Sequence, residues 1–442
     1  MNRFTHPRRF VRPSIWLLVC TLLATSCQDH QQPNPPDAAT YSADVVTSWL
    51  TLQLKLTQTT PAAAFLMPRR FAYAAISAYE SIVPGLPGYQ SIAPQLNGLT
   101  NLPTVVSGQN YYWPACANAA LAAMNRNYYP TTSAANKTSI DSLETLFTNQ
   151  FLKNRTADEL NRSADFGKKI AAAVFDWSKT DRYDDATPYT VPTGLGLWVR
   201  TPPALAAPLG TNIGKARPIL ANSDAGADQG PPTPYSENPA SAYYAQAKEV
   251  YDVSQSRTAE QQTIALFWAD NADGRSFISG HWLSILNQIL LVRQPKLDVA
   301  TTAFVQMSIA LSDTQISIFK SKYLYNTMRP ITYIRATLNQ PTWNALFATP
   351  PFPEYPSAHA VQSGAMSQTL TMFFGANYTF TDNSYNLVGF SPRSYNSFGE
   401  AATEAANSRL YGSIHYRKTN ETSLLQGEAV ANNVAQKLKF KR

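Results

Sequence analysis

Three clusters of cationic and imidazole side chains, far apart in the last third of the chain, constrain its fold more than any other feature. They are Lys322-Tyr-Leu-Tyr-Asn-Thr-Met-Arg329-Pro330, then Pro356-Ser357-Ala358-His359, and then Ser408-Arg409 followed by His415. A neutral ligand does not require so many cations and imidazoles, whereas an oxyanion is bound by cations and free N–H groups together. The sequence therefore predicts a fold that brings three distant segments around one tetrahedral anion.

The first cluster predicts the end of a helix. Lys322 and Arg329 are seven residues apart, which corresponds to about 700° on a helix, so both would project from nearly one face. Pro330 follows directly and is poorly tolerated inside a helix, so we expect the helix to kink or end near Arg329.

The other two clusters also predict helix ends. Ser357 and His359 stand where a helix begins, and a helix start offers free N–H groups and a partial positive charge. Arg409 and His415 are six residues apart and would point in different directions on one straight helix. Gly412 between them allows a break, which would place Arg409 near the end of one helix and His415 near the start of the next.

The rest of the chain shows helical periodicity, with no alternating strand pattern of any length. The expected helices are 42–60, 71–82, 113–127, 138–153, 156–179, 241–253 and 258–268. This pattern predicts an all-α fold of packed helical bundles. Residues 181–239 are rich in Pro, Gly, Asn and Asp, and we expect an ordered crossover near the mouth of the pocket. Within it, Trp198 and Arg200 are interpreted as packing residues, with substrate contact as the alternative.

The N-terminus predicts export. Residues 1–26 combine four arginines, no acidic residue and a short apolar stretch, which is typical of a signal peptide. The stretch ends before Cys27, which resembles the lipidated residue of a bacterial lipoprotein; plain secretion is the alternative. We expect an envelope protein anchored to the membrane by lipid, with residues 27–40 as a tether.

Composition limits the remaining function classes. The formal charge is +7, and it falls to about +3 without the four leader arginines. This charge is too small to indicate a nucleic-acid partner. Of the three cysteines, Cys20 lies in the leader and Cys27 would be lipidated, so Cys116 has no partner for a disulfide and is expected in the core. After the tether, we divide the chain into an N-terminal helical region, residues 41–257, and a C-terminal catalytic region, residues 258–442.

The three clusters, in this order and spacing, resemble the signature of the superfamily that joins type 2 phosphatidic acid phosphatases with vanadium-dependent haloperoxidases. The sequence around the clusters is similar to that of the bacterial haloperoxidase-related branch, in the segments Asp313–Arg335, Pro351–Gly364 and Ser397–His415. The resemblance extends from about Thr258 to the C-terminus. It implies a vanadium chloroperoxidase-like helical core with vanadate as cofactor, although phosphate could occupy the same site.

The resemblance also implies a role for each residue. His415 would be the ligand of vanadium or, in a phosphatase, the nucleophile that becomes phosphorylated. His359 would be the acid–base group, and Lys322 would polarise the peroxide. The other residues implied in oxyanion binding are Arg329, Ser357, Ala358 and Arg409.

Two positions depart from the family pattern. Ala358 stands where Gly is usual, which retains the N–H but adds a methyl group beside the anion. Thr419 stands where an Asp usually orients the last His. An imidazole ligand is normally oriented by an acceptor on its other nitrogen. We therefore expect a backbone carbonyl or Asn420 to serve, or the activity to be impaired.

His281 and Asp270 are expected around the site rather than in it. His281 is interpreted as orienting a helix end, with a third active-site imidazole as the alternative. Asp270 is a candidate partner for a pocket arginine, because buried cations require a nearby carboxylate. A metal site built from His281, Asp270 and Asp273 is a weaker alternative, since the spacing matches no common ligand pattern.

The sequence thus predicts an exported enzyme that oxidises halide with hydrogen peroxide. The first alternative is a soluble acid phosphatase that acts on phosphate esters through a phosphohistidine. The second alternative is a surface lipoprotein that binds an oxyanion without catalysis.

Overall fold

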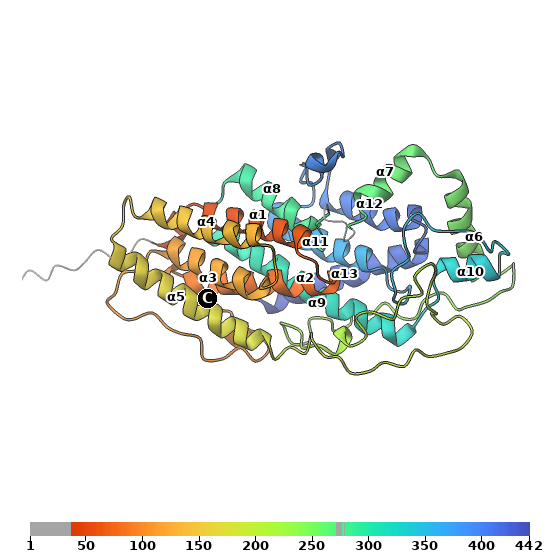
Figure 1. The fold of residues 1–442 in the computed structure, drawn as a ribbon, viewed down its shortest axis with the longest axis horizontal. Coiled ribbons are helices and arrows are strands. Elements are labelled where there is room, and N and C mark those ends of the chain that lie inside the picture. The colour runs from red at the N-terminus through yellow and green to blue at the C-terminus, as the bar shows by residue number, and fades with distance from the viewer. Residues whose placement is uncertain (1–36, 271–275, 278) are drawn as a thin grey trace, which may run out of the picture. The chain divides into compact units, whose positions relative to one another are not determined.

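Helices form most of a computed structural model of the chain, which describes residues 37–270, 276, 277 and 279–442 (Figure 1). The helices are α1 (Asp44–Thr59), α2 (Met67–Ile82), α3 (Trp113–Tyr128), α4 (Ala134–Phe151), α5 (Ala157–Ser178), α6 (Ala242–Ser256), α7 (Ala259–Phe267), α8 (His281–Arg293), α9 (Leu297–Tyr325), α10 (Pro330–Ala336), α11 (Ala358–Phe374), α12 (Phe398–Tyr411) and α13 (Arg417–Lys437). The predicted helical fold is confirmed. The expected signal peptide and Cys27 lie outside the described residues, whereas Ala38–Thr40 of the expected tether form a short 3-10 helix.

The N-terminal helices pack through small and aromatic side chains. Helix α2 contacts α3, α5 and α9, and its residues 71–79 are all buried. Helices α3 and α5 approach so closely that a Cβ added at Gly167 would lie 2.1 Å from the carbonyl oxygen of Cys116. Cys116 is fully buried, as expected for a core residue.

The C-terminal bundle holds the motif-bearing helices together. Helix α11 packs on α13, α12 and α9. Its contact with α13 is made at two glycines: a Cβ at Gly427 would lie 1.9 Å from the carbonyl oxygen of Val361, and one at Gly364 would lie 2.2 Å from that of Leu424. These backbones touch because neither glycine carries a side chain.

The first cluster differs from the helix predicted for it. Helix α9 ends at Tyr325 because Asn326 adopts a left-handed conformation (φ 46°), and Arg329 is the N-cap of α10. Lys322 and Arg329 therefore do not share a face of one helix. The predicted break between Arg409 and His415 is present, since α12 ends at Tyr411 and α13 begins at Arg417.

One short hairpin accompanies the helices. Strands β1 (Phe380–Asp382) and β2 (Arg393–Tyr395) form an antiparallel hairpin in which Phe380 pairs with Tyr395. With three residues in each strand, the alternating pattern is too short to be recognised in the sequence. The hairpin matters because it supplies Asp382, whose contacts are described below.

The crossover of residues 181–239 lies along the C-terminal part of α9. The Trp198 amide donates to the Asn326 carbonyl (2.7 Å), and the Trp198 side chain is fully buried. Its interpretation as a packing residue is therefore confirmed. Among the described residues that line the cavity of the site, none comes from this crossover, but Gly210 packs against the lining residue Phe319 and the Leu209 amide donates to the Pro351 carbonyl (3.0 Å). The expected place of the crossover near the pocket mouth stays a prediction. No helix in the described part of the chain is both long and apolar enough to cross a bilayer.

Substitution Gly427→Ala is expected to destabilise the protein by about 1–3 kcal/mol or more, because the new methyl group would overlap the α11 backbone. Gly399→Ala is the matched control. Gly399 lies in the first turn of α12, where the nearest atom to an added Cβ is 3.8 Å away, so this variant should be neutral or slightly stabilised. Urea unfolding of both variants measures the difference, and equal midpoints would contradict the close backbone contact.

Candidate oxyanion site

A cavity of about 200 Å³ lies where the three clusters meet. Four of the residues expected to hold the oxyanion or act on it line this cavity, namely Ala358, His359, Arg409 and His415, and so does Asp270, which was expected around the site. Much of the remaining wall is apolar and is formed by Phe65, Phe319, Phe347, Pro350, Phe352 and Ile414. Lys322, Arg329 and Ser357 are fully buried behind this lining. The fold therefore brings the predicted residues to one place. We call the lining residues the outer layer, and the buried residues behind them, Lys322, Arg329 and Ser357, the inner layer.

The His415 ring is fixed in one protonation state by its partners. Its Nε2 lies 3.1 Å from Nη1 of Arg329, and its Nδ1 lies 2.8 Å from Oε1 of Glu354. A guanidinium can only donate, so Nε2 must be the acceptor and Nδ1 must carry the proton. Burial and the nearby cations Arg329 and Lys322 hold the pKa of His415 well below its usual value. The ring is thus neutral, with its lone pair on Nε2.

Glu354 is the functional residue that the sequence reasoning missed. Its carboxylate accepts hydrogen bonds from His415, from the Tyr416 amide (3.2 Å) and from the Thr419 hydroxyl (3.0 Å). The expectation that a backbone carbonyl or Asn420 would orient His415 was wrong, because a carboxylate reaches it from the segment before α11. The signal available in the sequence was a Glu within the apolar, proline-rich run Pro350–Pro356.

Lys322 is held by backbone oxygens. Its ammonium donates to the carbonyls of Pro353 (2.8 Å), Glu354 (3.1 Å) and Pro356 (2.5 Å). Burial, and then the charge of Arg329, lower the pKa of Lys322 far below its usual value, while the Glu354 carboxylate opposes this shift. The Phe352 ring lies 4.9 Å from the ammonium and 5.1 Å from the Arg329 guanidinium, which favours both cations.

Two donors in the inner layer have no partner among the described residues. They are the Ser357 hydroxyl and Nη2 of Arg329, and both are buried. Ser357 is also the N-cap of α11, so the helix start predicted there is confirmed. A buried donor without an acceptor is unfavourable, and an oxyanion would satisfy both. The residues present therefore fit a tetrahedral oxyanion.

His359 and Arg409 are neighbours on the outer layer. His359 Nε2 lies 3.4 Å from Nη1 of Arg409, whose Nη2 donates to the Trp268 carbonyl (3.0 Å). Burial and the Arg409 charge lower the pKa of His359, although its side chain remains 29% exposed to the cavity. Burial lowers the pKa of Arg409 to about 10, and Asp270 opposes the shift. A neutral imidazole that faces the cavity can accept a proton.

Asp270 and His281 do not take all the roles expected of them. Among the described ion pairs, Asp270 contacts His281 (3.1 Å) and lies 4.0 Å from His359, but it pairs with neither pocket arginine. His281 is the first residue of α8 and does not line the cavity, so it is not a third imidazole of the pocket. Asp273 lies outside the described residues, within which no group of side chains is arranged to hold a metal ion.

This arrangement defines a class of protein: a helical bundle in which two histidines and three buried cations are gathered around one cavity. The family model described as VCPO second helical-bundle domain matches residues 302–441. The structure of a bacterial vanadium-dependent iodoperoxidase is 31% identical, with a TM-score of 0.82, and the match covers 91% of this chain and 97% of that one. No curated protein matches the chain in sequence.

Two further structures share the fold. They are the apo and holo forms of a bacterial vanadium-dependent chloroperoxidase, each 15% identical, with TM-scores of 0.66 and 0.65. The matches cover 86% of this chain and 96% and 93% of those chains. The chain belongs to the vanadium-dependent haloperoxidase family, whose members are enzymes of the peroxidase class.

Substitution Glu354→Gln is expected to weaken vanadate binding by about 10–100-fold, because partners that orient a ligand histidine commonly have effects of this size. Calorimetric titration of the purified protein with vanadate measures the affinity. The matched control is Glu80→Gln. Glu80 is also buried and accepts from the Ser91 hydroxyl and the Ile92 and Ala93 amides, far along the chain from the site. Equal vanadate affinity in both variants would show that Glu354 does not orient His415.

Proposed function

We propose that this protein is a vanadate-dependent haloperoxidase that oxidises iodide with hydrogen peroxide. The observation that carries the proposal is the combination of a neutral His415, whose Nε2 lone pair faces Nη1 of Arg329, and two buried donors of the inner layer, the Ser357 hydroxyl and Nη2 of Arg329, that lack an acceptor among the described residues. Vanadate would be held by Arg329, Ser357, Arg409 and the Ala358 amide, with His415 as its ligand. Bound there, it would supply the Lewis acid that activates peroxide toward halide.

The protein's own groups supply the proton transfer and the charge. His359 is neutral and faces the cavity, so it can take a proton from hydrogen peroxide and return it to the product. Lys322, Arg329 and Arg409 stabilise negative charge without a large rearrangement, because carbonyls and neighbouring side chains already hold them in place.

The cavity wall supports iodide as the halide. Its phenylalanine rings and Pro350 cannot replace the water around an anion, so entry costs a strongly hydrated chloride more than a weakly hydrated iodide. The iodoperoxidase among the similar structures agrees with this choice. Ala358 adds a methyl group at the lining and narrows the site further.

The proposal is tested by assaying the purified protein with hydrogen peroxide and each halide, with and without vanadate. We expect iodide oxidation only with vanadate, with lower rates for bromide and chloride. His359→Ala should bind vanadate with little change but lose about 10²–10⁴-fold in rate, because it removes only the acid–base group.

Other outcomes of this assay point to the alternatives. Release of phosphate from a phosphate ester, inhibited by vanadate, would identify an acid phosphatase. That reading draws on the same geometry, since an oriented neutral His415 also suits a phosphohistidine nucleophile. Vanadate binding without either reaction would indicate a protein that only binds oxyanions.

We further propose that the enzyme is exported and anchored to the cell envelope through lipid on Cys27. The basis is the basic and apolar leader, residues 1–26, which ends directly before this cysteine. Cys27→Ser is expected to abolish incorporation of labelled palmitate and to release the protein from the membrane fraction. Cys116→Ser is the control, because Cys116 is buried and its replacement should leave lipidation unchanged. Persistent labelling of the Cys27 variant would contradict the anchor.

A further inference from the structure

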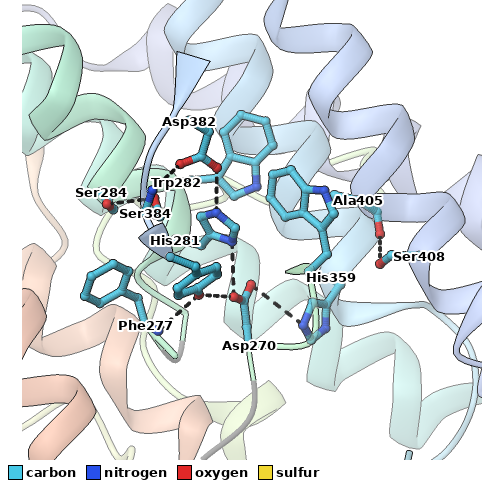
Figure 2. A network of polar contacts seen from close by, with 12 residues as sticks. Asp270, Phe277, His281, Trp282, Ser284, His359, Asp382, Ser384, Ala405 and Ser408 are labelled. Atoms are coloured by element: carbon cyan, nitrogen blue, oxygen red, sulfur yellow. Dashed lines mark hydrogen bonds and ion pairs between the residues drawn. The ribbon is translucent and has the colours of Figure 1, made fainter. Parts of the chain in front are cut away.

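His281 is a buried imidazole with a carboxylate at each ring nitrogen (Figure 2). Nδ1 lies 3.1 Å from Oδ1 of Asp270, and Nε2 lies 2.7 Å from Oδ2 of Asp382. A neutral imidazole has only one N–H, so it cannot donate to two carboxylates at once. Burial opposes a charge on this ring, but the two carboxylates outweigh burial and raise the pKa of His281 to about 10. The ring is therefore an imidazolium.

The position of this cation is unusual for a helix. His281 is the first residue of α8, where the helix dipole disfavours positive charge. Its side chain is 1% exposed and stacks on Trp268, with ring centroids 4.3 Å apart. A residue that only capped the helix would be expected to be an acceptor or an anion. The contacts indicate instead that the imidazolium joins two acidic side chains from different segments.

Asp270 carries this contact to the site. Its Oδ1 accepts from His281, while its Oδ2 lies 4.0 Å from His359 Nε2 (Figure 2). The Tyr385 hydroxyl also donates to Oδ1 of Asp270. Asp270 adopts a left-handed backbone conformation (φ 45°), which Asp tolerates better than most residues. It also follows Trp268 by two residues, and the Trp268 carbonyl holds Arg409. The segment thus borders both outer-layer residues.

We call His281 with its two carboxylate partners, Asp270 and Asp382, the clamp. Asp382 is also held firmly in place. Asp382 is fully buried at the end of β1, and its second oxygen accepts from the Ser384 amide (2.9 Å) and the Gln288 side chain (3.4 Å). Ser384 in turn donates to Ser284 of α8 (2.8 Å). The hairpin is therefore bound to the same helix that carries His281.

From this geometry we infer that His281 is a positioning residue: anchored by Asp382, it holds Asp270 with one carboxylate oxygen directed at His359. The role rests on the proposed function, because it is through His359 that the clamp would act on the reaction. Asp270 held in this way stabilises the proton that His359 takes up and gives back. His281 itself touches neither the cavity nor the reacting groups.

The charges around His359 make this role distinguishable from two simpler ones. Burial, Arg409 and, more weakly, His281 lower the pKa of His359, whereas Asp270 raises it, and the effect of Asp270 exceeds that of His281. If His281 holds Asp270 in place, its loss removes the larger, favourable effect and the pKa of His359 falls. If His281 acts only as a nearby cation, its loss raises that pKa. If its role is only structural, the pKa does not move.

The test is His281→Gln in the full chain, with the histidine rings labelled with ¹⁵N and followed by NMR without vanadate. The chain has five histidines, and His359→Gln assigns the signal of interest. We expect the pKa of His359 to fall. In the vanadate-loaded enzyme, kcat/KM for peroxide should drop by about 10–100-fold, and the acidic limb of its pH profile should move to lower pH. A raised or unchanged His359 pKa would overturn the inference.

Two further variants keep the test decisive. If His281→Gln does not fold, Asp382→Asn removes the carboxylate at Nε2 of His281 while it retains the imidazole. The pKa of His281 should then lie well below 10, and the pKa of His359 should fall as in His281→Gln. Asp313→Asn is the control, because Asp313 is a buried carboxylate that accepts from the Ile219 and Leu220 amides and contacts no member of the clamp. Absence of peroxidase activity in the unmodified protein would refute the proposed function, whereas the NMR titration would still decide whether the clamp exists.

Discussion

Three cations, Lys322, Arg329 and Arg409, are buried around one cavity, and among the described residues Glu354 is the carboxylate that lies beside the first two. Burying charge without compensation is strongly unfavourable, and burial accordingly lowers the pKa of Arg329 to about 10. Most local features of the site reduce this cost. Three carbonyls surround Lys322, and an aromatic face covers two of the cations. The charge that remains is what an oxyanion would neutralise, so folding and anion binding depend on the same interaction.

Three histidines of the same chemistry are given different roles by their partners. His415 accepts from a guanidinium and donates to a carboxylate, which leaves it neutral with one defined lone pair. His281 meets two carboxylates and is charged. His359 lies between Arg409 and Asp270 and faces the cavity, where it can change its protonation state. Environment rather than residue type assigns the ligand, the clamp and the acid–base group.

The sequence predicts those parts of the site that depend on local structure. The helix start at Ser357 and the break between Arg409 and His415 follow from capping and glycine, and both are present. Glu354 and Asp382 could not be assigned in advance, because their roles arise from contacts across 61 and 101 residues of sequence. Lys322 and Arg329 were predicted on one helix face, but Asn326 ends the helix between them.

The glycine contacts between α11 and α13 have a mechanical consequence. With no side chains at Gly364 and Gly427, the two backbones interlock, and sliding one helix along the other would force main-chain atoms into collision. The helix that carries His359 and the helix that follows His415 must therefore travel together as a single rigid body. Any widening that admits reactants would therefore have to come from lining residues outside this helix pair, such as Phe65 and Phe347. The part of the cavity wall that these two helices carry would therefore keep its shape during catalysis.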